Sequence, residues 1–567
     1  MKFRRRIAGA FLLYALLIQS AFAQTAAPVG KVYTAPNSDI EKIKDEGLNR
    51  SQVMQTLSYL TDVIGSRLTG SPNLKRANEW TRDAMAKWGM QNAHLEAWGP
   101  FGRGWALKDF HAEIVDPQTI PLTAFPKAWS PSTNGTITGD VVYLNIKSDA
   151  DLEKYKGQLR GKVVLMSPQR ELKADFTGMG SRMSDEELSK LAAAPDPNAQ
   201  RAGVPATNPF SQPSPQMQER INRFMLGLKA LKFLVDEGAA LAIDNSRGGS
   251  GGTVFVQGAD VAQEVPADIM EFFTRHDRLE PQQKAAEAKM IPQIVVATED
   301  YNRLVRMIQF GVKPKISVNI QAQYYDDDPM AYNTIAEIPG TDPKLKSELV
   351  MLGGHIDSWH SGTGATDNGA GVAVAMEAAR ILLASGLKPR RTIRVGLWSG
   401  EEQGLFGSSN YVKKHFGEMK GGPNIFGVPE PNAGKPELIK DHEYDNLSAY
   451  YNLDNGTGKI RGVYMQGNAG VRPYFEAWLA PFANMGAKTL TLANTGGTDH
   501  LSFDAIGLPG FQFIQDEIEY DTRTHHSNQD VFDRIQADDM KLSATIMAAF
   551  VYQTAMMDEK MPRKAVK

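Results

Sequence analysis

The chain has 567 residues, more than one hydrophobic core usually organises, so we expect two domains or one domain with a large insertion. Hydrophobic residues make up 42% and charged residues 22% of the chain, which is typical of folded soluble proteins and excludes a largely disordered chain. The net charge of -3 argues against nucleic-acid binding, and the absence of cysteine excludes disulfides, thiolate metal ligands and a cysteine nucleophile.

Residues 1–23 have the features of a removable secretion signal. Basic residues precede the apolar run 7–18, and Ala21-Phe22-Ala23 fits a small-x-small cleavage site. The apolar run is shorter than the ~20 residues that a spanning helix needs, so an uncleaved membrane anchor is the weaker alternative. Cleavage would lower the formal net charge from -3 to -7. We expect a periplasmic or secreted protein without stable membrane insertion.

The first half of the mature chain predicts helices followed by a mixed segment. Residues 40–98 are mostly helical in pattern, interrupted by a turn at 64–71. The expected later elements are strands at 136–144, 161–166 and 239–243 and an amphipathic helix at 221–237. Residues 195–215 are rich in Pro, Ala, Asn, Gln and Ser, which predicts a surface loop or lid.

From residue 333 onward, apolar strands alternate with helices. The strands are expected at 349–352, 393–398, 449–453 and 510–514, and the helices at 370–384 and 537–557. This alternation predicts an α/β fold with a mixed, mostly parallel sheet sandwiched by helices. Functional sites in open sheets of this kind lie at the carboxyl ends of the strands.

Five polar clusters stand at such strand ends, at a helix start or near the end of the chain. They contain His355, Asp367, the pair Glu401-Glu402, Asp454 and the pair His525-His526. Each cluster alone has a simple structural explanation, such as a hydrogen-bonded histidine, an acidic turn or a helix cap. Together they supply a complete set of metal ligands, which favours a metal site.

A ligand count divides this set between two zinc ions. Zinc favours about four His and carboxylate ligands and keeps one position for water at a catalytic site. If Asp367 and a water bridge the ions, His355 and Asp454 complete one site. Glu402 and His526 then complete the other. Three carboxylates and a bridging hydroxide balance two divalent ions.

Three further carboxylates have expected roles beside the metals. Glu401 has no place in the ligand count, so we expect it to act as the general base for the bridging hydroxide nucleophile. Asp357 is expected to orient His355 by bonding its second ring nitrogen, and Asp530 to do the same for His526.

These motifs resemble those of the co-catalytic di-zinc aminopeptidase family, which includes bacterial leucyl aminopeptidase, glutamate carboxypeptidase and carboxypeptidase Q. The matching segments are Gly354-His355-Ile356-Asp357-Ser358, Thr366-Asp367-Asn368-Gly369, Glu401-Glu402-Gln403-Gly404-Leu405 and His526-Ser527-Asn528-Gln529-Asp530. The resemblance implies the same two zinc ions per chain, the same ligands and the same base as the ligand count. One departure is the histidine pair: the spacing to Asp530 favours His526 as ligand, and His525 is then placed to bond the tetrahedral intermediate.

The resemblance covers most of the mature chain and implies its domain organisation. Segments 64–71 and 497–500 are similar to further family motifs. Residues 122–318 resemble a β-rich protease-associated domain inserted into a peptidase domain formed by 24–121 and 319–567. The Pro-rich stretch 171–220 is longer than that domain usually carries, and its role is open.

The remaining charged clusters are expected to be structural. His360, His415 and His442 are assigned to surface or packing roles, and residues 326–328 to a solvated linker. Asp499 and His500 are expected to support the site without binding metal.

The predicted activity is hydrolysis of a peptide bond next to a free terminus, by an aminopeptidase or a dipeptidase. A carboxypeptidase remains an alternative because specificity lies in pocket-lining loops. A glutaminyl cyclotransferase with one zinc and a non-catalytic receptor-like homologue are further alternatives, but no ligand or base is missing. The expected partner is a peptide or dipeptide, with no nucleic acid, and the sequence leaves a homo-oligomer open.

Overall fold

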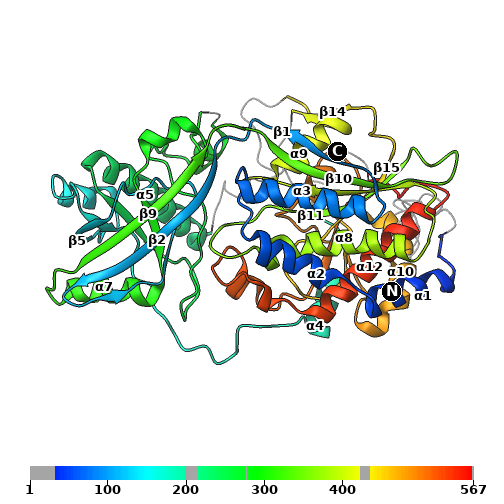
Figure 1. Cartoon of the computed structure of the whole chain (residues 1–567), viewed down its shortest axis with the longest axis horizontal. Helices are drawn as coiled ribbons and strands as arrows, with labels where there is room; N and C mark the ends of the chain where they lie inside the picture. The colour runs from blue at the N-terminus through cyan, green and yellow to red at the C-terminus, as the bar shows by residue number, and fades with distance from the viewer. Residues whose placement is uncertain (1–31, 198–213, 276, 422–433, 565–567) are drawn as a thin grey trace, which may run out of the picture.

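The computed structural model describes residues 32–197, 214–275, 277–421 and 434–564 (Figure 1). The expected secretion signal and most of the Pro-rich loop at 195–215 lie outside the described residues. Within them, no helix combines the length and apolar character needed to cross a bilayer.

The main sheet is mixed and has eight strands. Their order is β1 (Gln91–Trp98), β10 (Ala331–Ile338), β12 (Thr392–Trp398), β11 (Leu349–His355), β15 (Leu447–Asn452), β18 (Gly510–Gln515), β16 (Ile460–Tyr464) and β17 (Thr489–Thr491). The central strands β12, β11, β15 and β18 are parallel, so their carboxyl ends share one edge. The predicted α/β fold with a mixed, largely parallel sheet is confirmed.

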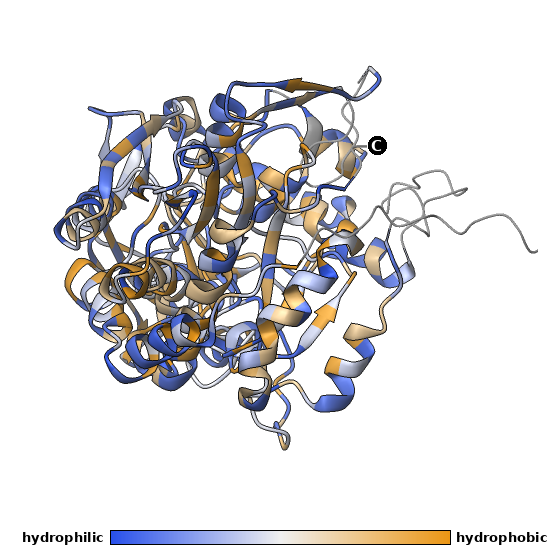
Figure 2. Ribbon diagram, turned by 90° about the vertical axis from the view of Figure 1, so that its right-hand side faces the viewer, coloured by the Kyte–Doolittle hydropathy of each residue, from blue (hydrophilic) through white to orange (hydrophobic). Residues whose placement is uncertain are grey.

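Helices cover both faces of this sheet. The largest core includes side chains from α1 (Asn37–Asn49), α2 (Val53–Ser58), α3 (Pro72–Lys87), α8 (Ala370–Ala384), α10 (Arg472–Leu479) and α12 (Ala537–Met556). A second core packs α9 (Phe406–His415) and α11 (His500–Asp504) against the sheet. Nearly every side chain of α8 and α12 is buried, which explains their apolar sequences. In Figure 2 many of the other helices are banded with hydrophilic and hydrophobic residues.

The helical expectation for residues 40–98 is wrong at its end. Residues 91–98 form β1, whose Leu95 and Trp98 pair with Thr334 and Ala331 of β10. The pairing partner lies far away in the sequence, and this tertiary contact decides the conformation of a short segment whose local pattern is ambiguous.

A second eight-stranded sheet forms an inserted domain, here defined as residues 104–325. Its strand order is β3 (Ile120–Pro121), β2 (Gly104–Asp116), β9 (Lys315–Tyr325), β5 (Ile137–Tyr143), β6 (Val163–Leu165), β7 (Leu241–Asn245), β8 (Gln293–Val296) and β4 (Ala124–Pro126). The helices α5 (Pro215–Glu237), α6 (Ile269–Thr274) and α7 (Thr298–Gln309) accompany these strands. The long antiparallel pair β2 and β9 connects the two halves of the molecule (Figure 1). This sheet therefore extends beyond the expected bounds 122–318 at both ends.

One segment of the inserted domain crosses to the main domain. Residues 171–197, here called the strap, run to α4 (Asp185–Ala192), which lies beside the main domain in Figure 1. Ser181 pairs with Ile518 through their backbones, and the Arg182 guanidinium contacts Asp516 and Asp539 at 2.9 and 2.7 Å. The strap thus reaches the loop that follows β18. A small hairpin of β13 (Gly417–Lys420) and β14 (Glu437–Lys440) completes the fold.

Candidate metal centre and active site

The parallel strands bring the predicted ligands to one edge of the main sheet. His355 is the last residue of β11 and pairs in register with Trp398 at the end of β12. The pair Glu401-Glu402 follows β12, and Asp454 follows β15. All these side chains are largely buried. The edge of the sheet is therefore the common origin of four of the expected groups.

One histidine lies against two carboxylates of this group. The Nε2 atom of His355 is 3.2 Å from Asp367 Oδ1 and 3.3 Å from Asp454 Oδ1. Glu401 Oε2 is farther from this nitrogen, at 3.9 Å. The order of distances agrees with Asp367 and Asp454 as ligands and with Glu401 held nearby.

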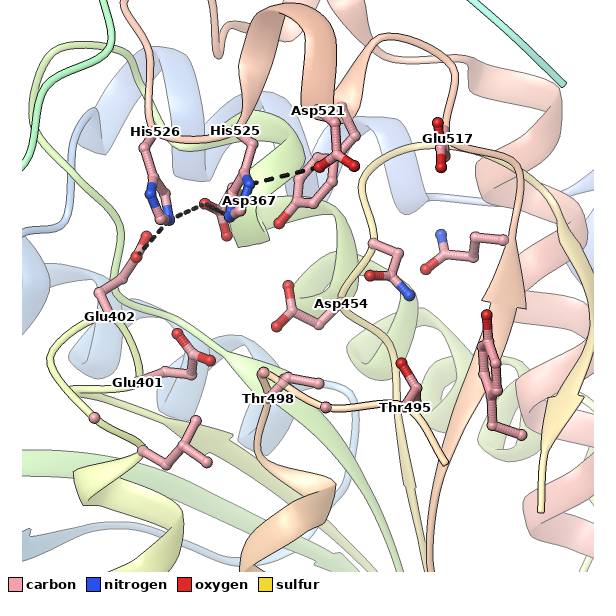
Figure 3. A pocket seen from close by; sticks show the side chains of 18 of the residues that line it. Asp367, Glu401, Glu402, Asp454, Thr495, Thr498, Glu517, Asp521, His525 and His526 are labelled. Carbon is pink, nitrogen blue, oxygen red and sulfur yellow. Dashed lines mark ion pairs between the residues drawn. The ribbon is translucent and has the colours of Figure 1, made fainter. Parts of the chain in front are cut away.

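The other histidine lies on the opposite side of Asp367. The Nε2 atom of His526 is 2.9 Å from Glu402 Oε2 and 3.3 Å from Asp367 Oδ2 (Figure 3). Asp367 therefore directs one carboxylate oxygen to each histidine. This is the arrangement that a bridging carboxylate requires.

Several oxygen atoms of this group are buried and have no hydrogen-bond partner. These atoms are Asp367 Oδ2, Asp454 Oδ1 and Glu402 Oε1. Buried acceptors are rarely left unpaired unless an ion or a ligand completes them. Candidate ligand atoms of His355, Asp367 and Asp454 all lie within 4.8 Å of one another, as do those of Asp367, His525 and His526. The donor set of imidazole nitrogen and carboxylate oxygen fits zinc.

The charges in the site are strongly coupled. Burial lowers the pKa of His526, but Glu402 and Asp367 outweigh it and raise this pKa to about 10. Burial and the neighbouring Asp367 raise the pKa of Glu402 to about 7. For Glu401, burial raises the pKa, His355 opposes the shift and Asp454 reinforces it. A buried carboxyl with a raised pKa suits a group that accepts and returns a proton.

Asp357 organises both sides of the catalytic edge. Its carboxylate accepts bonds from the backbone N–H groups of Glu401 and Glu402, each at 3.3 Å, and from the Thr69 hydroxyl at 2.9 Å. Its Oδ1 atom is also 3.5 Å from Nδ1 of His355, while its backbone carbonyl is closer, at 3.1 Å. Asp357 therefore lies beside His355 as expected and additionally holds the turn that carries both glutamates.

The early turn at 64–71 stabilises the loop between His355 and Asp367. The Arg67 guanidinium is fully buried and donates to the carbonyls of Ile356, Thr363 and Gly364 at 2.7 Å each. These carbonyls belong to the loop between His355 and Asp367. The sequence motif singled out this turn, but the bonds that explain it are seen only in the fold.

A close approach fixes the start of α8 against the strand end before Asp454. A Cβ atom at Gly371 would lie 2.1 Å from the backbone oxygen of Leu453. Only glycine permits this contact, which brings the start of α8, shortly after Asp367, next to Asp454.

The expected contact between Asp530 and His526 is wrong. Asp530 Oδ1 accepts bonds from the backbone N–H and the hydroxyl of Thr366, at 2.6 and 2.8 Å, and Oδ2 accepts from the backbone of Asp367 at 3.2 Å. Its carboxylate is thereby committed to the bridging-ligand loop. The second nitrogen of His526, Nδ1, instead lies 3.1 Å from the side-chain amide of Gln257 in the inserted domain.

The two adjacent histidines have different surroundings. His525 Nε2 is 3.9 Å from Asp367 Oδ2, farther than His526 Nε2, and its ring stacks on Tyr520 with centroids 4.6 Å apart. Burial lowers the pKa of His525, which keeps this ring neutral near pH 7. His526 has a positive φ of 67°, a strained conformation that tends to occur at functional sites. These features favour His526 over His525 as the metal-binding residue.

A pocket of about 660 Å³ opens beside these groups. Glu401, Asp454 and His525 lie on its catalytic side, and Tyr464, Gln515 and Glu517 also line it. Met183 of the strap contributes to the wall. Among the described residues, no lysine or arginine lines the pocket. Gln257, Met183 and the residues after β18 could not be identified as site residues from the sequence, because nothing in their local pattern indicates chemistry.

The remaining polar residues lie in structural settings. His415 is held between Glu96 and Glu443 at 2.8 and 3.0 Å, and His442 is exposed. The His360 ring contacts the carbonyl of Pro126. In the acidic run, Asp326 pairs with Arg103 and Asp328 with Lys75.

Asp499 and His500 are fully buried near the site. Burial raises the pKa of Asp499 to about 7 and lowers that of His500 to about 4. His500 contacts Gln466 and the carbonyl of Thr495 through Nε2, which agrees with a supporting position.

Comparison with known proteins identifies the main domain. Residues 333–551 match the sequence profile of Peptidase family M28. The chain carries an M28 peptidase domain. The protein is a metallo-exopeptidase, as its motifs predict.

Similarity to curated proteins extends over the inserted domain. Carboxypeptidase Q of Mus musculus is 24% identical over 519 residues, covering 91% of this chain and 88% of the relative. Leupeptin-inactivating enzyme 1 of Streptomyces exfoliatus is 32% identical over 190 residues, covering 30% of this chain and 41% of the relative.

Two solved peptidase structures have a similar fold. A Peptidase M28 precursor from Shewanella amazonensis superposes with a TM-score of 0.63 at 21% identity, covering 94% of this chain and 99% of that one. A zinc aminopeptidase from Bacillus subtilis gives 0.51 at 17% identity, covering 90% and 96%.

Proposed function

We propose that this M28 peptidase is a zinc-dependent aminopeptidase or dipeptidase with two zinc ions in each chain. The observation that carries the proposal is the position of Asp367, whose two carboxylate oxygens face His355 and His526 at 3.2 and 3.3 Å. His355 and Asp454 would hold one ion, and His526 and Glu402 the other. The similar fold of the zinc aminopeptidase from Bacillus subtilis supports the choice of metal.

The residues divide the work of hydrolysis between them. Bound zinc lowers the pKa of water and polarises the scissile carbonyl. Glu401 takes the proton from the attacking water and delivers it to the departing amine. It suits this role because it lies beside the ligands and because burial raises its pKa. Asp357 keeps Glu401 and Glu402 in place through their backbone N–H groups. His525 lies beside Asp367 and is a candidate donor to the oxygen that becomes negative during attack.

The charge of the pocket favours recognition of a free amino terminus. An α-carboxylate is normally bound by a cation, most often arginine, and no lysine or arginine lines the described pocket. Acidic side chains surround it instead, which favours a protonated amine. The similarity to carboxypeptidase Q keeps a carboxypeptidase as the second candidate.

Other readings of the sequence remain as less favoured proposals. The presence of both His355 and Asp454 argues against a cyclotransferase with a single zinc ion. The presence of the buried base Glu401 argues against a non-catalytic receptor-like homologue. We further propose that residues 1–23 direct export, and that residues 24–103 and 326–567 form the peptidase domain around the inserted domain 104–325.

Dipeptides and longer peptides with free or blocked termini test the activity. Acetylation of the amino end should abolish cleavage by zinc-loaded protein, whereas amidation of the carboxyl end should leave it. Cleavage that ignores acetylation but requires a free carboxylate would overturn the preference for an aminopeptidase.

A further inference from the structure

The wall of the pocket after β18 carries an acid that the proposed reaction does not use. Glu517 lines the pocket and lies on the opposite side from Glu401 and Glu402 in Figure 3. Among the described residues it forms no ion pair, whereas its neighbour Asp516 is bound by Arg182 and Arg461. Asp516 and Glu517 are adjacent in sequence but have different surroundings. Within the described residues, Asp516 has two arginine partners and Glu517 has no cationic partner.

The surroundings of Glu517 are negative. Its pKa is raised by partial burial and by the nearby Asp521 and Glu187, the latter from the strap. Asp521 also lines the pocket and lies 3.7 Å from Nδ1 of His525. Three arginines near this wall have other partners: Arg182 and Arg461 pair with Asp516, and Arg247 lies over Phe255 and donates to the backbone carbonyl of His525. Like charges crowded in this way are relieved by a cationic ligand.

A second and independent feature is an unpartnered acceptor in the same pocket. Gln515 is 5% exposed, and its side-chain Nε2 donates to the carbonyls of Gly456 and Gly458. Its Oε1 atom is buried and has no partner. Because Gln515 lines the pocket, this oxygen is available to a donor on the substrate.

Tyr464 provides an aromatic surface beside these acceptors. It lines the same pocket as Glu517, and burial followed by the charge of Glu517 raises its pKa. An aromatic ring, a free carboxylate and an unpaired amide oxygen are the surroundings that an alkylammonium or guanidinium group prefers.

We propose that Glu517, Gln515 and Tyr464 form a subsite that binds the basic side chain of a lysyl or arginyl residue in the substrate. The inference rests on the proposed exopeptidase function. The α-amine is attached next to the scissile carbonyl and therefore stays near Glu401 and the metal ligands. Glu517 on the far wall is better placed for the end of a long side chain (Figure 3).

Dipeptides that differ only in the charge of one side chain test the subsite. Lysine is compared with norleucine in the first position, as Lys-Ala and Nle-Ala, and in the second, as Ala-Lys and Ala-Nle. In one of these positions the natural protein should prefer lysine in kcat/KM by about tenfold or more, the usual effect of a hydrogen bond to a charged group. Glu517→Gln should remove this preference and leave norleucine turnover within about twofold. Glu264→Gln, an exposed change away from the pocket, is the matched control.

Three outcomes would overturn the subsite: no preference for lysine, a preference that survives Glu517→Gln, or an equal loss for lysine and norleucine. The last result would place Glu517 at the α-amine or in a structural role. Calorimetric binding of L-lysine and L-norleucine separates this inference from the proposed function. A protein that cleaves no dipeptide but binds lysine through Glu517 would refute the exopeptidase and keep the subsite.

Discussion

The Nδ1 atom of His526 lies 3.1 Å from the side-chain amide of Gln257, so the inserted domain contacts a candidate zinc ligand directly. The backbones reinforce this contact, because Val256 donates to the carbonyl of His526 at 2.9 Å and Phe255 pairs with Ser527. A histidine that binds metal through Nε2 carries its proton on Nδ1. The Gln257 atom that faces Nδ1 in the structure is the amide nitrogen Nε2, so the amide turns over to present its oxygen when Nδ1 carries the proton, and that bond fixes the ring.

Replacing Gln257 should weaken metal binding without changing a ligand. We expect Gln257→Leu to lower the affinity of the metal site that contains His526 by about 10- to 100-fold, the usual cost of losing an orienting partner. Gln257→Glu keeps an acceptor and should bind metal nearly as well as the natural protein. Titration against a competing chelator measures both, with exposed Gln218→Leu as control. Unchanged affinity in Gln257→Leu would refute the orienting role.

Removing the proposed base should separate chemistry from metal binding. Glu401→Gln keeps the shape of the side chain but cannot accept a proton. We expect kcat to fall by about 10²- to 10⁴-fold while metal content stays the same. Steady-state kinetics and elemental analysis on the same sample test this. A variant that remains fast would exclude Glu401 as the base.

Asp357 should affect both the metal and the glutamate turn. Asp357→Asn halves the acceptor capacity that serves Glu401, Glu402 and Thr69, so we expect weaker metal binding and lower turnover together. Thr69→Val removes only the hydroxyl bond and should cost about 1 kcal/mol of stability. Chelator titration and thermal unfolding distinguish them. Equal effects of the two variants would contradict a central role for Asp357.

His415 should make the stability of the main domain depend on pH. Burial lowers its pKa, but Glu443 and Glu96 outweigh this and raise it from 6.5 to about 8. The pKa values of Glu96 and Glu443 fall from 4.5 to about 2, since their ion pairs exceed the effect of burial. Arg394 and Lys414 also face these acids, and Tyr411 stacks on the imidazole.

The sign of the dependence follows from these shifts. Stabilisation by protonated His415 is complete below pH 6.5 and is lost as the pH rises through about 8. The contribution of the two glutamates is present above pH 4.5 and is lost as the pH falls through about 2. We expect His415→Gln to cost about 1 kcal/mol at pH 6, after allowing for solvent screening, and clearly less at pH 9. Denaturant unfolding at both pH values measures the difference, and a cost independent of pH would contradict it.

The strands at the ligand edge could be predicted because they are short, apolar and buried on both faces. The strands β11, β12, β15 and β18 and helix α8 lie close to their expected positions for this reason. The polar residues after the strands then converge because parallel strands share one carboxyl edge. His355, Asp367, Glu402, Asp454 and His526 meet in space as the ligand count requires, and their roles as ligands remain predictions.

The contacts that could not be predicted join segments far apart in the chain. Asp530 stands near His526 in sequence, yet its carboxylate turns to Thr366, and Gln257 of another domain takes the expected place. Glu517 belongs to no motif, and only the fold shows that Asp516 has two arginine partners while Glu517 has no ion pair within the described part of the chain. Local pattern indicates which residue types are present, whereas tertiary packing selects their partners.

The number of zinc ions bound to active protein is the sharpest test of a dinuclear zinc site. Elemental analysis of purified, catalytically active protein should find two zinc ions per chain, and a chelator should remove metal and activity together. His355→Ala and His526→Ala should each lower the count. Active protein that contains no stoichiometric zinc, or only one ion per chain, would contradict the dinuclear site.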